Sequence, residues 1–174
     1  MLKIILIVIV VLIAALLAYA ATRPGSFRVQ RTKSIKASPE KIFPLIADFH
    51  NWLSWSPWEH RDPALKRTFS GADSGKGAVY AWEGNRNVGS GRMEIKEASP
   101  SKVTIQLDFI KPFEGHNVAE FTLQPAGDGT TVTWDMHGSS AYIAKVMGIF
   151  VSMDKMIGKD FEAGLENLKT VAEG

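Results

Sequence analysis

The chain of 174 residues contains no cysteine, which excludes disulfide bonds, thiolate metal sites and cysteine nucleophiles. Neither sign of charge predominates, because 20 Lys and Arg residues against 18 Asp and Glu residues leave a net charge of +2. This balance gives no support for a nucleic-acid partner. The sequence has no G-x-S-x-G, no P-loop and no G-x-G-x-x-G motif, so it offers no signature of a serine hydrolase, an NTPase or a dinucleotide enzyme.

Histidine is sparse and badly spaced for metal binding. His50, His60, His116 and His137 show no pattern such as i, i+4 on one helix. We therefore expect no metal and no cofactor.

A long apolar run opens the chain. Ile4 to Ala21 gives 18 apolar or weakly polar residues between Lys3 and Arg23, and at 1.5 Å per residue such a helix spans about 27 Å of bilayer. The alternative is a cleaved signal peptide ending near Ala18-Tyr19-Ala20. We predict a single-pass membrane anchor at residues 1–22, a linker at 23–26 and one domain at 27–174.

Basic residues gather just after this run. They precede the first acidic residue of the chain, Glu40, and are Arg23, Arg28, Arg31, Lys33 and Lys36. The positive-inside rule therefore slightly favours a domain on the cytoplasmic side over the periplasmic side. The same charges would attract anionic lipid headgroups.

The domain is expected to begin with a strand and two short helices. Phe27 to Ala37 alternates in polarity, and Ser38-Pro39-Glu40 is typical of a helix start. Asn51 is expected to cap a second short helix carrying Trp52 and Trp55. Six further strands follow between turn signals, at 64–69, 78–83, 91–97, 103–110, 117–124 and 131–138.

Alternation of apolar and polar residues along the last three strands predicts a sheet with one buried apolar face, the dry face, and one solvent-exposed polar face, the wet face. The dry face carries Val103, Ile105, Leu107, Phe109, Ala119, Phe121, Leu123, Val132, Trp134 and Met136. The wet face carries Gln106, Asp108, Glu120, Thr133, Asp135 and His137. A dry sheet face must be covered by another element.

The C-terminal segment supplies that cover. Apolar residues recur every three or four positions and predict one long amphipathic helix with a buried stripe of Ile143, Val146, Met147, Phe150, Met153, Ile157, Phe161, Leu165 and Leu168. Gly148, Gly158 and Gly164 interrupt the stripe, and each costs about 1 kcal/mol of helix propensity against alanine. Such glycines are typical of places where a backbone approaches its neighbour closely.

Four segments make this order of elements more specific. "IKASPEKIFPLIADFHNWLSWSPWE", "FIKPFEGHNVAEFTLQP", "GTTVTWDM" and "MDKMIGKDFEAGLENLK" resemble the membrane-anchored branch of the bacterial SRPBCC, or START-like, superfamily, also called polyketide cyclase/dehydrase-like. The resemblance covers about residues 27–172. It implies an α+β helix-grip fold, in which a curved seven-stranded antiparallel sheet wraps the C-terminal helix and leaves a hydrophobic cavity.

The resemblance also implies candidate ligand-binding residues. Trp52 and Trp55 would point into the cavity, and Trp58 would pack beside them after Pro57. Three roles are open for these tryptophans: packing in the hydrophobic core, gating the mouth of the cavity, or docking on a membrane. The full set of candidates is Trp52, Trp55, Trp82, Phe109, Phe121, Trp134, Met136, Met153, Ile157 and Phe161.

Three functions remain open at this point. The first is binding of a hydrophobic small molecule, such as a lipid, an isoprenoid or a polyketide-like compound, near the membrane. The second is a polyketide cyclase/dehydrase-like enzyme, which requires Glu59, Glu83 or His50 inside the cavity, because no catalytic motif is present. The third is a protein-interaction module without a ligand.

Overall fold

A single antiparallel sheet forms the centre of the fold. The computed structural model describes residues 1–140, 142–150 and 152–174. Seven strands are ordered β1-β7-β6-β5-β4-β3-β2. Their bounds are β1 Ser26–Ile35, β2 Lys66–Gly71, β3 Ala78–Glu83, β4 Ser90–Ser99, β5 Lys102–Lys111, β6 Gly115–Ala126 and β7 Gly129–Ser139. The expected seven-stranded meander is confirmed, with β1 at one edge beside β7.

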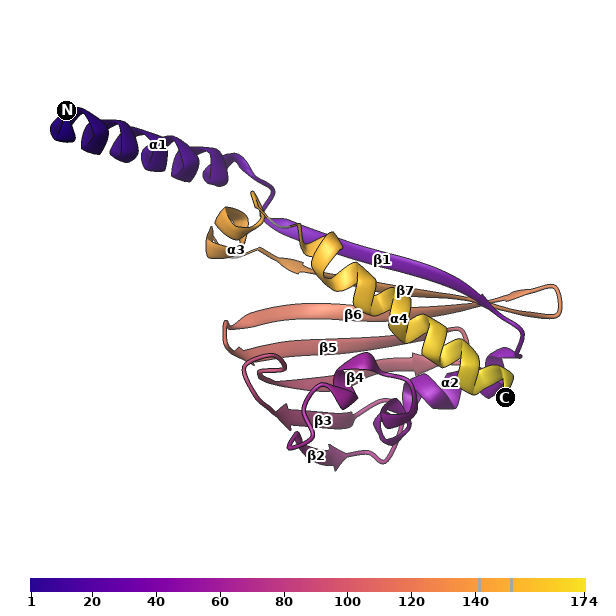
Figure 1. Cartoon of the computed structure of the whole chain (residues 1–174). Coiled ribbons are helices and arrows are strands. Elements are labelled where there is room, and N and C mark those ends of the chain that lie inside the picture. Colours follow the sequence, from indigo (N-terminus) through magenta and orange to yellow (C-terminus); the bar gives the residue numbers. More distant parts are fainter. Residues whose placement is uncertain (141, 151) are drawn as a thin grey trace.

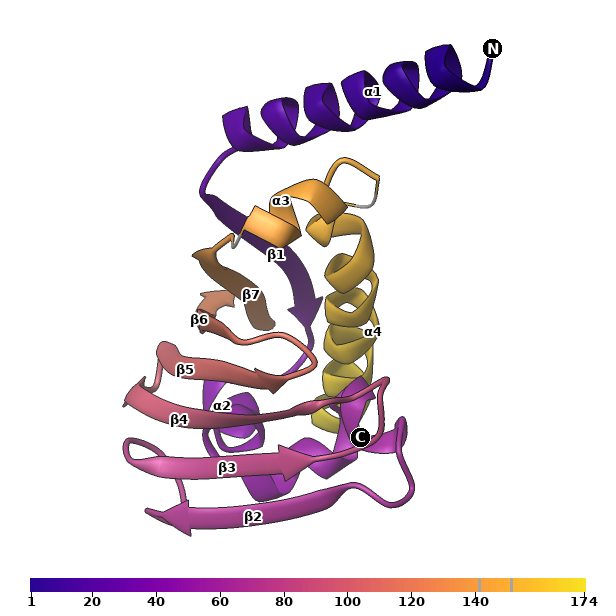
Figure 2. The ribbon, with the colours of Figure 1, turned by 90° about the vertical axis from the view of Figure 1, so that its left-hand side faces the viewer.

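The sheet curves around a C-terminal helix, α4 (Met153–Glu173), as Figure 2 shows. Side chains on the inner face are buried at alternate positions, as the sequence pattern predicts. The outer face departs from that pattern at Asp135, which was expected to be wet but is buried. Arg28 on β1 and His137 on β7 both bond to its carboxylate, which compensates for the loss of water.

Three short helical segments separate β1 from β2. They are α2 (Pro39–Ala47) and the 3₁₀ helices η1 (Phe49–Ser54) and η2 (Pro57–His60). The prediction of Asn51 as the cap is wrong, because η1 begins three residues earlier than expected and the Asp48 side chain accepts a hydrogen bond from His50 N. Asp and Asn side chains can cap a 3₁₀ helix as well as an α-helix. The residue type alone therefore does not decide between Asp48 and Asn51 as the cap.

The prediction of a single long C-terminal helix is also wrong. A short helix, α3 (Tyr142–Met147), ends before Gly148, and α4 begins at Met153 after the Ser152 cap. Ile143, Met147 and Phe150, expected in the buried stripe, are therefore exposed. From Ile157 onward the stripe packs against the sheet as predicted.

The N-terminal helix, α1 (Leu2–Thr22), projects away from the sheet (Figure 1). It is long and apolar enough to cross a membrane, and almost all of it is exposed. α3 packs beside its C-terminal part, and the Tyr142 hydroxyl donates a hydrogen bond to Leu17 O over 2.7 Å. The apolar helix, α3 and the start of β1 thus lie at one end of the domain.

Candidate functional site

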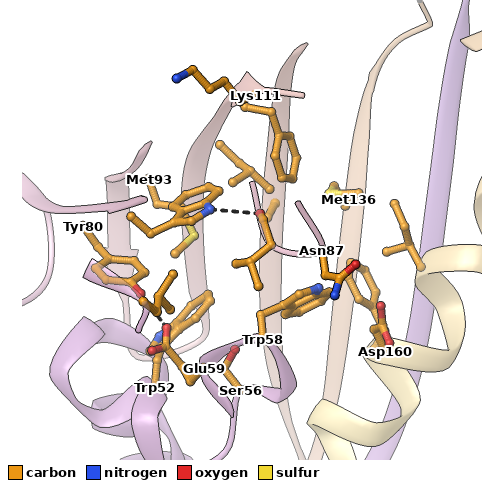
Figure 3. Close-up of a pocket in the computed structure, with 18 of the residues that line it drawn as sticks. Trp52, Ser56, Trp58, Glu59, Tyr80, Asn87, Met93, Lys111, Met136 and Asp160 are labelled. Atoms are coloured by element: carbon orange, nitrogen blue, oxygen red, sulfur yellow. Dashed lines mark hydrogen bonds between the residues drawn. The ribbon is translucent and has the colours of Figure 1, made fainter. Parts of the chain in front are cut away.

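A cavity of about 340 Å³ lies between the inner sheet face, α4 and the two 3₁₀ helices. Its volume falls at the lower end of the range of small-molecule sites. Its floor is formed by strand residues such as Met93, Leu107, Ala119 and Met136. Because the wall is mostly apolar, its chemistry suits a guest that is mainly hydrocarbon or aromatic (Figure 3).

The three closely spaced tryptophans, Trp52, Trp55 and Trp58, differ in their position relative to the cavity. Trp52 and Trp55 donate their indole N–H groups to Ile46 O and Leu45 O, at the end of α2. Trp52 also lines the cavity, whereas Trp55 is completely buried and does not. Trp58 lines the cavity instead, because Pro57 starts a new helical segment and turns the next ring back towards the sheet.

Trp134 lies at the centre of an aromatic cluster in the cavity wall. Its ring stacks on Phe161 of α4, with centroids 4.1 Å apart, and on Phe121 of β6, with centroids 4.8 Å apart. Its Nε1 is buried and has no hydrogen-bond partner among the described residues. An unpaired buried donor costs about 1–3 kcal/mol, a cost that the packing of the aromatic cluster offsets.

Trp82 takes its place through a glycine on the neighbouring strand. Gly91 pairs with Trp82 in the register, and a Cβ atom at Gly91 would lie 2.4 Å from the Trp82 ring. The absent side chain lets the ring lie over β4, where its N–H donates to Val88 O over 3.3 Å. Trp82 also meets Phe109 edge to face. These contacts build the cavity wall near the β3–β4 loop.

One end of the cavity carries a buried carboxylate, Glu59 of η2. Its Oε1 accepts a hydrogen bond from the Tyr80 hydroxyl over 2.7 Å, and its Oε2 pairs with Arg67 Nε at 2.6 Å. Burial, followed by the bond to Glu59, raises the pKa of Tyr80 above its ordinary value, and Glu59 raises the pKa of Arg67. Tyr80 therefore remains a neutral donor, and Glu59 is held by two partners.

Further polar groups reach the wall from other elements. Ser56, Asn87 and Asp160 line the cavity, and Asp160 pairs with Arg61. The cavity is therefore apolar over most of its surface, with separate polar points at which an oxygen or nitrogen of a guest can bond.

Seven of the ten predicted ligand-binding residues meet at this cavity. They are Trp52, Trp82, Phe109, Trp134, Met136, Ile157 and Phe161. Trp55 and Phe121 support the wall from behind in the core, and Met153 packs against the core at the start of α4. That any of the ten binds a ligand stays a prediction.

Sequence reasoning missed Tyr80, Met93 and Leu107 as wall residues. Tyr80 could have been found, since it lies two positions before Trp82 on the same strand and so on the same face. Of the three acid–base candidates, Glu59 lies in the wall, whereas Glu83 and His50 do not. The His50 ring stacks on Phe69 and its Nδ1 contacts Asp48.

Three possible metal ligands meet on the outer sheet face, away from the cavity. Glu120, Asp135 and His137 offer ligand atoms within 4.8 Å of one another. Each of the two carboxylates already has a cationic partner, Lys102 for Glu120 and Arg28 for Asp135. The cluster is therefore accounted for as cross-strand charge pairing.

The comparisons with known proteins agree with this geometry. Residues 26–173 match the family described as polyketide cyclase/dehydrase and lipid transport. A search of curated proteins gave no match.

Solved structures share the fold at low sequence identity. The crystal structure of protein CV1439 from Chromobacterium violaceum has 15% identity and a TM-score of 0.61, with 87% of this chain and 99% of that chain covered. A protein of unknown function from Staphylococcus aureus, SA2116, has 16% identity and a TM-score of 0.63, covering 85% and 94%. The Aha1 dimer from Colwellia psychrerythraea has 19% identity and a TM-score of 0.58, covering 84% and 96%. At these identities the likeness shows the fold alone.

Proposed function

Because the chain belongs to the polyketide cyclase/dehydrase and lipid transport family, we propose that its domain binds a hydrophobic small molecule in the cavity between sheet and α4. Lipids, isoprenoids and polyketide-like compounds are the ligand classes in question. The observation that carries the proposal is the apolar cavity of about 340 Å³. Protein interiors are otherwise close-packed, so a void of this size is unusual for a domain that has only to fold.

The polar points in the wall narrow the chemistry of the ligand. Tyr80, Ser56 and Asn87 are spaced among aromatic and methionine side chains of the wall. A guest with one or two oxygen atoms on an apolar frame would bond there and still bury its carbon surface.

A cavity-filling variant tests the proposal. Ala119 lines the floor and is almost fully buried, so Ala119→Leu places three more carbon atoms into the void. The full-length chain is purified from its own membranes, and native mass spectrometry measures the fraction that carries an apolar molecule. We expect the wild type to carry one and Ala119→Leu to lose most of it.

The matched control is Ala163→Leu, the same substitution at an exposed position of α4. It should retain the guest of the wild type. An empty wild-type chain that also takes up nothing from a lipid extract would overturn ligand binding.

A cyclase-like enzyme is the second candidate, and Glu59 is the observation that favours it. A buried carboxylate in an apolar cavity is a common general base. Against this role, Arg67 and Tyr80 already engage both of its oxygens. Glu59→Gln separates the two functions: a binding protein would keep its guest, whereas an enzyme would keep substrate uptake and lose turnover of a poly-β-ketone chain.

The location of the domain is part of the proposal. Residues 1–22 would anchor the chain in one pass, residues 23–26 would link, and residues 27–174 would hold the ligand near the bilayer, which raises its local concentration. The basic residues after α1 favour the cytoplasmic side. A C-terminal fusion to green fluorescent protein, which fluoresces in the cytoplasm and fails to do so after Sec export, tests the side.

A further inference from the structure

Large apolar side chains are exposed at one end of the domain. Outside α1, the described residues of this kind are Leu53, Ile110, Phe113, Tyr142, Ile143, Met147, Phe150 and Met156. Six of them belong to α3, the turn after it, the end of β5 and the β5–β6 turn, and Phe150 and Phe113 are 72% and 61% exposed. We call Ile110, Phe113, Tyr142, Ile143, Met147 and Phe150 the apolar rim. A soluble surface seldom gathers so many large apolar groups without a partner.

The strand register places the apolar rim at the end of the sheet where α1 joins. Ser26 at the start of β1 pairs with Ser139 at the end of β7, just before α3. Gly138 pairs with Asn117 near the start of β6, so the β5–β6 turn lies at this same end. Figures 1 and 2 show α1, α3 and this turn on one side of the domain. The exposure is therefore concentrated on the side of the apolar helix.

α3 lies directly against the part of α1 that precedes the linker. The Tyr142 hydroxyl donates to Leu17 O, and Ala20 is the buried residue of α1. Leu17 is five residues from the end of α1, which at 1.5 Å per residue is about 8 Å. When α1 spans a bilayer, the Tyr142 end of α3 therefore lies near the boundary between headgroups and hydrocarbon rather than in bulk water.

Cations accompany the apolar rim. Arg23 follows α1, Lys111 lies between Ile110 and Phe113, and Lys145 lies on α3 with its Nζ beside Gly25 of the linker. Apolar side chains flanked by Lys and Arg are the composition of segments that lie in the interface of an anionic bilayer. Glu114 is the acidic residue in the β5–β6 turn. The charge balance of this surface favours anionic lipid over an acidic or neutral protein surface.

We propose that the apolar rim is a second membrane contact, which docks the domain on the bilayer that α1 crosses. Lys111 at the end of β5 and Pro112 in the β5–β6 turn line the cavity, so docking turns this border of the cavity towards the lipid. A hydrophobic ligand then passes between bilayer and cavity without crossing water. Docking stands without any ligand, and this route alone rests on the proposed function.

The absence of cysteine makes the test clean, since one introduced cysteine is the only labelling site. Full-length Phe113→Cys and Phe150→Cys carry a nitroxide label in nanodiscs of phosphatidylcholine and phosphatidylglycerol that hold one chain each. Asp73→Cys, in the exposed β2–β3 turn at the opposite end of the sheet, is the aqueous reference. Collision with oxygen is compared with collision with a polar nickel complex.

We expect the labels at positions 113 and 150 to shift towards oxygen accessibility, and the label at 73 to remain with the nickel complex. Labels at 113 and 150 that behave like the one at 73 would overturn docking. Protection seen in multi-chain vesicles and absent in one-chain nanodiscs would assign the apolar rim to a second copy and also overturn it.

A second variant separates docking from folding and from ligand binding. Phe113→Ser combined with Phe150→Ser changes two exposed side chains, so the unfolding temperature should stay at the wild-type value. A nitroxide label at Ile143→Cys should be less accessible to oxygen in this double variant than in the chain that keeps both phenylalanines. If this label shows no loss, the two rings do not hold the rim in lipid. The guest detected by mass spectrometry is read separately, so ligand binding and docking can fail independently.

Discussion

Gly164 lies on α4 where the helix backbone passes against the Trp134 ring. A Cβ atom there would be 2.8 Å from Trp134 Cζ3 and 3.2 Å from Pro57 Cδ. Overpacking a core costs about 1–3 kcal/mol, which exceeds the helix propensity of about 1 kcal/mol that alanine gains. We expect Gly164→Ala to lower the free energy of unfolding by about 1 kcal/mol, measured by urea denaturation.

The exposed Ala163 beside it supplies the control. Ala163→Gly should also destabilise, by about 1 kcal/mol, because propensity alone acts at an exposed position. The two neighbouring positions thus prefer opposite residues. A stabilised Gly164→Ala variant would show that the ring and helix can separate at little cost.

His116 on the outer face gives a pH-dependent prediction. The hydrogen bond to Asp108, at 2.8 Å, raises the pKa of His116 above its usual range, and His116 and Gln106 lower the pKa of Asp108 against its burial. Since the folded pKa of His116 is raised, this pair favours the fold at pH below the unfolded value and the benefit is lost as pH rises through the folded value. Asp108→Asn should therefore shift the imidazole titration, followed by NMR, to lower pH.

Glu114 provides the comparison, since it lies farther from the imidazole, at 3.9 Å, and is a minor cause of the raised pKa. Glu114→Gln should move the His116 titration less than Asp108→Asn does. Equal shifts would mean that the exposed carboxylate, rather than the hydrogen bond, controls the imidazole.

Residue roles were predictable where strand periodicity fixes the face, and less so elsewhere. Trp134 and Met136 fall on the inner face of β7, as alternation predicts. Trp58 lines the cavity in place of Trp55, because two 3₁₀ helices, the second beginning at Pro57, do not keep the phase of an α-helix. The pairing of Glu59 with Tyr80 joins residues 21 positions apart and depends on tertiary packing.

At the scale of elements, the break between α3 and α4 is the main departure from the sequence pattern. Apolar spacing continues through the break, but Gly148 weakens the helix and Ser152 starts a new one, its Oγ accepting a hydrogen bond from Lys155 N over 3.2 Å. Periodicity reports which residues are apolar and not which partner they meet. The residues before the break face away from the sheet, and those after it cover the cavity.

The Ser152 cap is directly testable. Ser152→Ala should lower the free energy of unfolding by about 1 kcal/mol, since one amide of the first turn of α4 loses its acceptor. Ser152→Asp keeps an acceptor and should retain the stability of the wild type. Urea denaturation of the three proteins measures both effects, and an unchanged Ser152→Ala variant would show that α4 is positioned by packing alone.

At the scale of the whole molecule, the sequence predicts the fold class and the apolar N-terminal helix. It does not predict where that helix lies relative to the sheet and the cavity. Alternation gave the strands and their faces, and the C-terminal stripe gave the covering helix. Register decides which turns meet at one end of the sheet, and a sequence pattern does not fix register between distant strands. The convergence of α1, α3 and a border of the cavity on one end is therefore a property of the fold.

Linkage between ligand and stability gives the last prediction. A ligand that binds the folded domain alone, at a free concentration of 100 times its Kd, stabilises the fold by about 2.7 kcal/mol. For a domain of about 150 residues this raises the unfolding temperature by roughly 5–10 °C. Ala119→Leu should show a much smaller rise in unfolding temperature with the ligand, because its side chain takes up part of the space of the guest. The variant lacking Phe113 and Phe150 should keep the full shift once ligand is supplied, since neither ring lines the cavity. A full shift in Ala119→Leu would place the ligand elsewhere on the molecule, and calorimetry of the three proteins with one lipid extract decides between these outcomes.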